Sequence, residues 1–191
     1  MRVIAGEFRS RKLQSLPGAD VRPTSDKLRE TLFDIIGPSI QGLVLVDAYA
    51  GTGAVGIEAI SRGARHVVFI EKNKDACELI KSNLAALKIG REGRLIHGAA
   101  GLHLGKVEAD LVFIDPPYPK EREYEAAMEA MEEKPPALVI VQHSSRFALR
   151  EFYGPLHRTR IVKQGENSLS FYRPIEAASP EAASSQEEHP E

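Results

Sequence analysis

The stretch LVLVDAYAGTGAVG, residues 43–56, decides the fold of this chain. Its apolar run over 43–46 predicts a short buried strand that ends in Asp47. The glycines that follow permit a tight turn and let the backbone approach a ligand closely. A helix is expected over 54–62, closed by Gly63. A strand, a glycine-rich turn and a helix in this order are typical of the dinucleotide-binding unit of an α/β sheet.

Short apolar strands and amphipathic helices alternate along the rest of the chain. Further strands are predicted over 67–70, 94–97, 111–114 and 137–141, and further helices over 26–36, 74–88, 121–132 and 144–152. A closing antiparallel hairpin is expected over 157–163 and 168–173, with its turn at Gly165. We therefore expect an α/β fold with a seven-stranded, mostly parallel sheet and a C-terminal antiparallel hairpin, as in Rossmann-like methyltransferases.

The chain has 191 residues, the size of one domain. Residues 1–40 are expected to form a small β-hairpin, over 1–14, and a helix, both packed on the core. Residues 41–173 make up the core in this prediction. Residues 174–191 are expected to be a disordered acidic tail, because they hold Pro, Ala, Ser and five Glu but no Lys or Arg.

Composition narrows the class of protein. The net charge is −2, yet without the tail 25 basic residues face 22 acidic ones. A mildly basic body with a basic front end is compatible with a polyanionic partner, although charge alone favours an ordinary solvated surface. No run reaches the ~18 apolar residues of a membrane span, and the single Cys77 excludes an internal disulfide. We expect a cytoplasmic protein without a membrane partner.

The glycine-rich turn is expected to bind the adenosine part of a cofactor. Residues 51–56 match the pattern G-x-G-x-x-G, and Glu71 lies twenty residues beyond Gly51, at the end of a predicted strand. An acid there can accept hydrogen bonds from both ribose hydroxyls, so the pattern fits NAD and S-adenosyl-L-methionine alike, and a purely structural turn is the alternative. Asp47 favours S-adenosyl-L-methionine, because a carboxylate attracts its cationic methionine portion and repels a pyrophosphate.

The tetrapeptide DPPY, residues 115–118, follows the apolar run at 111–114. In an open α/β sheet the carboxyl ends of the strands form the edge where ligands bind. The Asp115 carboxylate and the Pro116 carbonyl can accept the two hydrogens of an exocyclic amine, and Tyr118 can stack on a planar base. The alternative is a strand end followed by a proline turn. Together with the cofactor pattern, the tetrapeptide indicates methylation of an amino nitrogen on a planar base.

Three segments in sequence order make the chain resemble a known family. They are the basic opening MRVIAGEFRSRKL at 1–13, the segment RPTSDKLRETLF at 22–33, and the glycine-rich motif with Glu71 and DPPY. The chain is thereby similar to the bacterial small-subunit rRNA guanine-N2 methyltransferases, the RsmD family, over most of residues 1–173. The resemblance implies an S-adenosyl-L-methionine-dependent enzyme. It also implies that the enzyme methylates the exocyclic N2 amine of one guanine of small-subunit (16S) rRNA, within a ribosomal particle.

The motifs and the resemblance together assign the expected site residues. The expected catalytic residues are Asp115, Pro116 and Tyr118. Cofactor binding is expected from Asp47, Ala48, Gly51, Thr52, Gly53, Glu71, Lys72, Ala99 and Asp115. RNA contacts are expected from Arg2, Arg9, Arg11, Lys12, Arg22, Thr24 and Arg29.

Two positions depart from the pattern of the family. After the third predicted strand the family often has an acid or amide that faces the adenine amine, whereas Ala99 stands in this region, so the adenine would rely on backbone groups. Gln142 stands where the fifth strand often ends in an acid. The six histidines are scattered without the spacing of paired ligands, so no metal is expected.

Three other functions remain open at this point. The glycine pattern and the acid are shared with NAD-dependent oxidoreductases. The DPPY tetrapeptide also permits methylation of another planar amine, such as adenine N6 in DNA. Finally, an RNA-binding assembly factor could retain a vestigial cofactor site.

Overall fold

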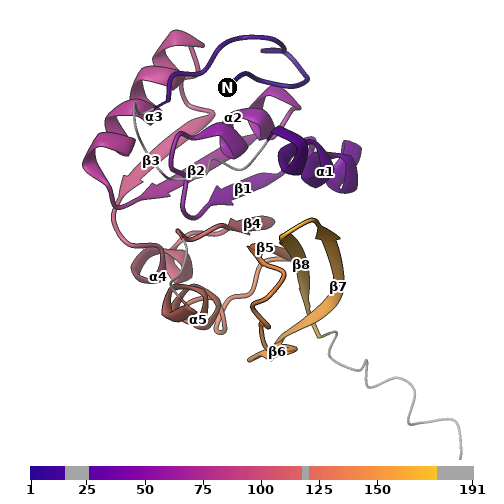
Figure 1. The fold of residues 1–191 in the computed structure, drawn as a ribbon. Coiled ribbons are helices and arrows are strands. Elements are labelled where there is room, and N and C mark those ends of the chain that lie inside the picture. The colour runs from indigo at the N-terminus through magenta and orange to yellow at the C-terminus, as the bar shows by residue number, and fades with distance from the viewer. Residues whose placement is uncertain (16–25, 118–120, 176–191) are drawn as a thin grey trace, which may run out of the picture.

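One mostly parallel sheet organises the molecule (Figure 1). The computed structural model describes residues 1–15, 26–117 and 121–175, and these contain an eight-stranded sheet of order β3-β2-β1-β4-β5-β8-β7-β6. The strands are β1 Val44–Asp47, β2 His66–Glu71, β3 Gly93–His97, β4 Leu111–Ile114, β5 Leu138–Ser144, β6 Phe152–Tyr153, β7 Leu156–Gln164 and β8 Asn167–Pro174.

The direction of the strands changes at one side of the sheet. β1 pairs in parallel with β2 and with β4, and β5 joins β4 in the same direction. β8 runs antiparallel to β5 and forms the closing hairpin with β7. The expected parallel sheet with an antiparallel hairpin is confirmed, and the eighth strand is the two-residue β6. Because the chain order reverses between β1 and β4, the edge above these two strands is where such sheets bind ligands.

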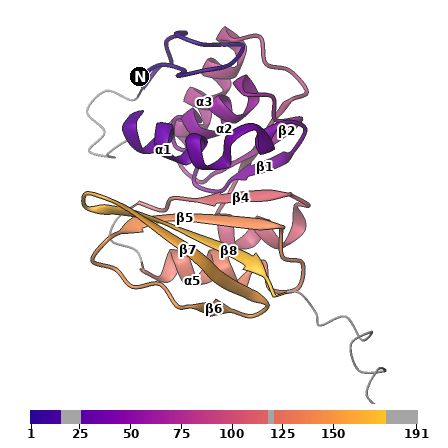
Figure 2. The same cartoon turned by 90° about the vertical axis from the view of Figure 1, so that its right-hand side faces the viewer.

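Helices cover both faces of the sheet, and Figure 2 shows α1, α2 and α3 on one side of the strands and α5 on the other. This arrangement explains why the centres of β1, β2 and β4 are apolar and buried, whereas the edge strand β3 exposes Arg94 and His97. The face of α2 that contains Gly56 packs directly on β2. A Cβ added to Gly56 would lie 2.3 Å from a ring carbon of Phe69, so only glycine allows this close approach. The helical elements are α1 Asp26–Ile36, the 3₁₀ turn η1 Gly37–Ile40, α2 Ala54–Ser61, α3 Lys74–Ala86, α4 Ala100–His103, the 3₁₀ turn η2 Leu104–Lys106 and α5 Glu121–Glu129.

The hairpin expected over residues 1–14 is reduced to a single antiparallel bridge between Arg2 and Lys12. The backbone of this segment finds other partners, because side chains of α2 accept the N–H groups of Ile4, Ala5 and Phe8. With these donors engaged outside the segment, the two arms cannot form a continuous ladder.

The helix predicted over 144–152 is wrong, because the chain forms turns between β5 and β6 there. Side chains from outside the segment hold its carbonyl groups. The His143 ring bonds the carbonyls of Ser144 and Phe147, and the Tyr172 hydroxyl donates to the Arg150 carbonyl at 2.7 Å. A helix over 144–152 needs the Ser144 and Phe147 carbonyls for its own ladder, whereas the Arg150 carbonyl would lie in its last turn, which has no intrahelical partner.

The remaining boundaries follow the sequence closely. α4, with η2 after it, is a short helical stretch that the sequence pattern did not indicate. β8 continues to Pro174, and the tail expected to be disordered falls from 176 onward outside the described residues. Within the described parts of the chain, no helix has the length and apolar character that crossing a membrane requires.

Candidate active site

Three carboxylates lie at the carboxyl ends of adjacent parallel strands. In the sheet register Asp47 is aligned with Phe69 of β2 and with Phe113 of β4. Glu71 therefore lies two residues beyond that level on one side, and Asp115 two residues beyond it on the other. Asp47 is the deepest of the three acids and is 2% exposed. The predicted cofactor acids and the predicted catalytic acid are thus brought to one edge of the sheet.

Asp47 is a buried acid with an unusual protonation equilibrium. Its Oδ2 accepts a hydrogen bond from the Gly56 N–H at 3.0 Å. Burial, followed by the negative charges of Asp115 and Glu71, raises the pKa of Asp47 to about 7. Among the described residues no lysine or arginine forms an ion pair with Asp47 or Glu71. A cation arriving at this edge would relieve the cost of ionising Asp47.

The glycine-rich loop is held in shape by Glu71. The Gly51 N–H donates to one oxygen of this carboxylate at 2.9 Å, and the Asn73 N–H donates to the other at 2.7 Å. Gly51 and Gly53 have φ angles of +54° and +77°, which only glycine adopts readily. Among the described residues, a Cβ on Gly51 would meet only the Tyr49 carbonyl, at 4.0 Å, so this side of the loop is open to them. Each Glu71 oxygen has a second lone pair for a hydroxyl group.

A network that the sequence did not indicate joins this loop to α5. The Tyr49 hydroxyl donates to the Glu123 carbonyl at 3.0 Å and contacts its carboxylate at 3.1 Å. The Lys72 Nζ donates to the same carboxylate at 2.7 Å. Burial and the negative charge of Glu123 raise the pKa of Tyr49. The Lys72 side chain, expected to face the cofactor, is therefore turned toward α5.

The other predicted cofactor and catalytic residues divide into two groups. Asp115 is half-buried, Pro116 is buried, and Tyr118 lies outside the described residues. Ala48, Thr52 and Ala99 lie at the same edge, where Ala99 precedes the first turn of α4 and the neighbouring Gly98 N–H donates to the Glu71 carbonyl at 2.9 Å. Within the described ranges, no group of three or more potential ligand side chains that could hold a metal ion is found.

A family model described as Conserved hypothetical protein 95 matches residues 1–173. The chain belongs to this family. The Bacillus subtilis protein named "Putative rRNA methyltransferase YlbH" is 33% identical over 185 residues, which cover 91% of this chain and 98% of that protein. The Haemophilus influenzae protein named "Ribosomal RNA small subunit methyltransferase D" is 38% identical over 123 residues, 62% of this chain and 64% of that protein. The resemblance to the RsmD family is thereby confirmed.

A solved structure agrees with the family. The Escherichia coli protein titled "Putative methyltransferase yhhF" superposes with a TM-score of 0.80 at 30% identity, covering 91% of this chain and 97% of that protein. The expected Rossmann-like methyltransferase fold is therefore confirmed, with the carboxylates at its ligand edge. The chain is a methyltransferase by family and by fold.

The residues expected to contact RNA are not all on the surface of this member of the Conserved hypothetical protein 95 family. The side chains of Arg2, Arg9, Arg11 and Lys12 are exposed. Arg29 is 0% exposed and donates to the Arg2 carbonyl at 2.7 Å and to the Asp26 carboxylate at 3.0 Å, so the structure gives it a bracing place inside the fold. Arg22 and Thr24 lie outside the described residues.

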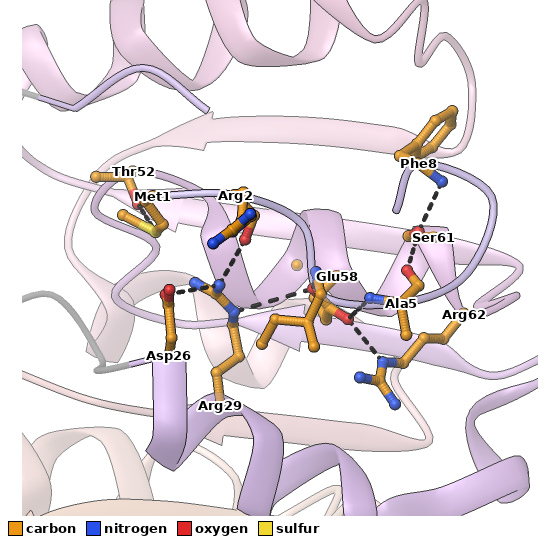
Figure 3. Close-up of polar contacts among 12 residues, drawn as sticks. Met1, Arg2, Ala5, Phe8, Asp26, Arg29, Thr52, Glu58, Ser61 and Arg62 are labelled. Atoms are coloured by element: carbon orange, nitrogen blue, oxygen red, sulfur yellow. Dashed lines mark hydrogen bonds and ion pairs between the residues drawn. The ribbon is translucent and has the colours of Figure 1, made fainter. Parts of the chain in front are cut away.

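Residues 1–15 of this family member, the N-terminal segment, are fastened to α2 by two side chains (Figure 3). Glu58, which is 0% exposed, accepts from the N–H groups of Ile4 at 2.8 Å and Ala5 at 3.0 Å. Ser61 accepts from the Phe8 N–H at 2.9 Å and donates to the Ala5 carbonyl at 2.5 Å. A glutamate within the otherwise apolar helical run at 54–60 is the signal by which the sequence could have revealed this contact.

Proposed function

We propose that this chain transfers a methyl group from S-adenosyl-L-methionine to the exocyclic N2 amine of a guanine in small-subunit rRNA. The observation that carries the proposal is the convergence of Asp47, Glu71 and Asp115 at the ligand edge of a methyltransferase fold. This edge offers acceptors and negative charge beside an open glycine-rich loop, and the lysines and arginines of the described residues leave Asp47 and Glu71 without an ion pair.

The chemistry of these side chains fits S-adenosyl-L-methionine, which supplies an electrophilic methyl group on a sulfonium when bound. Asp47 would attract the cationic methionine portion, because its raised pKa falls again beside a positive charge. Glu71 would accept the ribose hydroxyls with its free lone pairs. The backbone of Ala48, Gly51, Thr52 and Gly53 would line the donor, and Ala99 would face the adenine through its backbone.

The acceptor amine would be held by the start of the DPPY tetrapeptide. The Asp115 carboxylate and the Pro116 carbonyl accept its two hydrogens in this proposal, which leaves the nitrogen lone pair directed away from both. Acceptors that are fixed before the reaction need no reorganisation during it. A base must leave its stack to reach them, at a cost of a few kcal/mol. Tyr118 would offset about 1–3 kcal/mol of that cost by stacking.

The names of the relatives support the choice of substrate. The Bacillus subtilis relative is named for rRNA, and the Haemophilus influenzae relative for the small ribosomal subunit. The exposed side chains of Arg2, Arg9, Arg11 and Lys12 supply positive charge for phosphate groups. We infer that the substrate is rRNA within a ribosomal particle, and that the protein acts in the cytoplasm.

A labelling experiment tests this function. Small subunits from a strain lacking the protein are incubated with the purified protein and labelled S-adenosyl-L-methionine, and the methylated nucleotide is mapped. Label on guanine N2 is the expected result. Label on adenine would replace the proposed substrate by another planar amine, and donor binding without any label would favour an RNA-binding assembly factor.

Variants of Asp115 test the mechanism. Asp115→Ala should lower transfer by about 10²-fold or more while donor binding remains largely intact. The control is Asp110→Asn at the opposite end of β4, where the carboxylate accepts from the Val44 N–H at 2.8 Å and an amide oxygen can replace it. Near-normal turnover by the Asp115→Ala protein would contradict the proposed role of this carboxylate.

A further inference from the structure

A buried asparagine connects the N-terminal segment to the glycine-rich loop. Asn83 of α3 is 1% exposed, and its Oδ1 accepts from the Gln14 N–H at 2.8 Å. Its Nδ2 donates to the Gln14 carbonyl at 3.3 Å and to the Thr52 carbonyl at 3.0 Å. Both amide hydrogens are therefore used, one for each segment. Asn83 lies among the apolar residues of the helical face predicted over 74–88, which is the sequence signal for it.

The two groups that Asn83 joins belong to two different binding surfaces. Thr52 lies between the two loop glycines with positive φ, so its carbonyl is part of the tight turn that would receive the donor. Gln14 lies near the end of the N-terminal segment, which carries the exposed basic side chains. A second contact joins the same surfaces, since the Thr52 hydroxyl lies 3.9 Å from the Met1 sulfur (Figure 3).

The first half of the N-terminal segment is held by contacts that do not involve Asn83. Glu58 and Ser61 hold residues 4–8 on α2, and α2 begins directly after the glycine-rich loop. RNA that orders the basic side chains in this geometry would therefore also hold Gln14 in place. Asn83 would pass that order to the Thr52 carbonyl, because its amide cannot keep all three bonds if either segment shifts.

We propose that Asn83 is a positioning residue that couples RNA binding by the N-terminal segment to methyl-donor binding by the glycine-rich loop. The inference rests on the proposed function, since it takes the donor and RNA as the two ligands. Coupling between two sites is reciprocal, so RNA raises donor affinity by the same factor by which the donor raises RNA affinity. Ordering of the segment by one ligand lowers the entropy cost of binding the other.

The test measures the affinity of S-adenosylhomocysteine, which cannot transfer a methyl group, with and without an unmodified transcript of small-subunit rRNA. In the wild-type protein the transcript should strengthen binding about fivefold or more. In the Asn83→Ala protein that ratio should fall close to one. A matched control is Leu87→Ala at the C-cap of α3, one turn beyond Asn83, a buried apolar side chain that cannot hydrogen-bond either segment; it should lower stability and keep the wild-type ratio.

Hydrogen exchange supplies a readout that does not depend on how well a variant folds. In the wild-type protein, S-adenosylhomocysteine should slow amide exchange in residues 1–15, although the proposed donor site lies at Thr52. An unchanged rate there, or an Asn83→Ala protein that keeps the wild-type affinity ratio, overturns the coupling alone. A wild-type protein that fails to bind S-adenosylhomocysteine overturns the proposed function and the coupling together.

Discussion

Asp47 is the residue at which burial and charge matter most. Its pKa is raised from 3.8 to about 7 because the carboxylate is buried near Asp115 and Glu71. The folded protein therefore binds a proton more tightly at this site than the unfolded chain does. The resulting contribution to stability is fully present below pH 4 and is lost as the pH rises toward 7. A cation bound beside Asp47 at neutral pH would favour its ionised form and would lower this pKa again.

Replacement of Asp47 by Asn should remove this part of the pH dependence. Relative to the wild type, the Asp47→Asn protein should gain free energy of unfolding between pH 4 and pH 7, by on the order of 3 kcal/mol. Donor affinity should behave in the opposite way, rising with pH toward 7 in the wild type and staying flat in the variant. Urea unfolding and calorimetric titration at several pH values measure both trends. Parallel curves for the two proteins would contradict the assigned ionisation.

Among the helices, α2 depends on a charge network at its centre. Glu58 faces the buried Arg29 guanidinium at 3.9 Å and accepts from the Arg62 Nε at 2.8 Å, besides the two N–H groups of the N-terminal segment. Such a network orients elements as much as it stabilises them, because a buried charge is costly unless every partner is in place. Through Glu58, α2 holds the N-terminal segment against the core (Figure 3).

Loss of Glu58 should be far more costly than loss of a surface glutamate. Glu58→Ala leaves Arg29 with a buried, poorly compensated charge, and about 3–5 kcal/mol of the free energy of unfolding should be lost. Glu78→Ala removes an exposed ion pair with Lys81 on α3, which water and salt screen, so its loss should cost far less stability than the loss of Glu58. Chemical denaturation of both proteins gives the comparison. Equal losses would show that the network is not a stabilising unit.

How well each element could be predicted from the sequence depends on where its hydrogen bonds go. The parallel strands and α1 to α3 followed from periodicity, because their backbone bonds are local or lie within the sheet. The helix predicted over 144–152 failed because the ring of the preceding His143 and the hydroxyl of the distant Tyr172 hold its carbonyls. The positions of Asp47 and Glu71 could be predicted because both follow strand ends. The bond from Lys72 to Glu123 could not be predicted, because it joins residues 51 apart in sequence that no local pattern relates.

At the scale of the whole molecule, positive charge and the ligand edge are joined through the N-terminal segment. The exposed basic side chains belong to a segment that is fastened to α2 by Glu58 and to α3 by Asn83. Those two helices flank the glycine-rich loop, because α2 begins at its end and Asn83 bonds its Thr52 carbonyl. A polyanion bound by this charge would therefore act on the same structural unit as the methyl donor.

The salt dependence of RNA binding should reveal how many of these charges meet phosphate groups. Each phosphate contact contributes about 0.7–0.9 to the slope of log K against log salt concentration. Arg9→Gln and Lys12→Gln should each weaken binding of small-subunit rRNA at every salt concentration and lower the slope by about 1. Lys163→Gln, an exposed position on the hairpin strand β7, should leave both unchanged. Filter binding across a salt series gives the slopes, and equal slopes for all four proteins would exclude the N-terminal segment as the phosphate-binding surface.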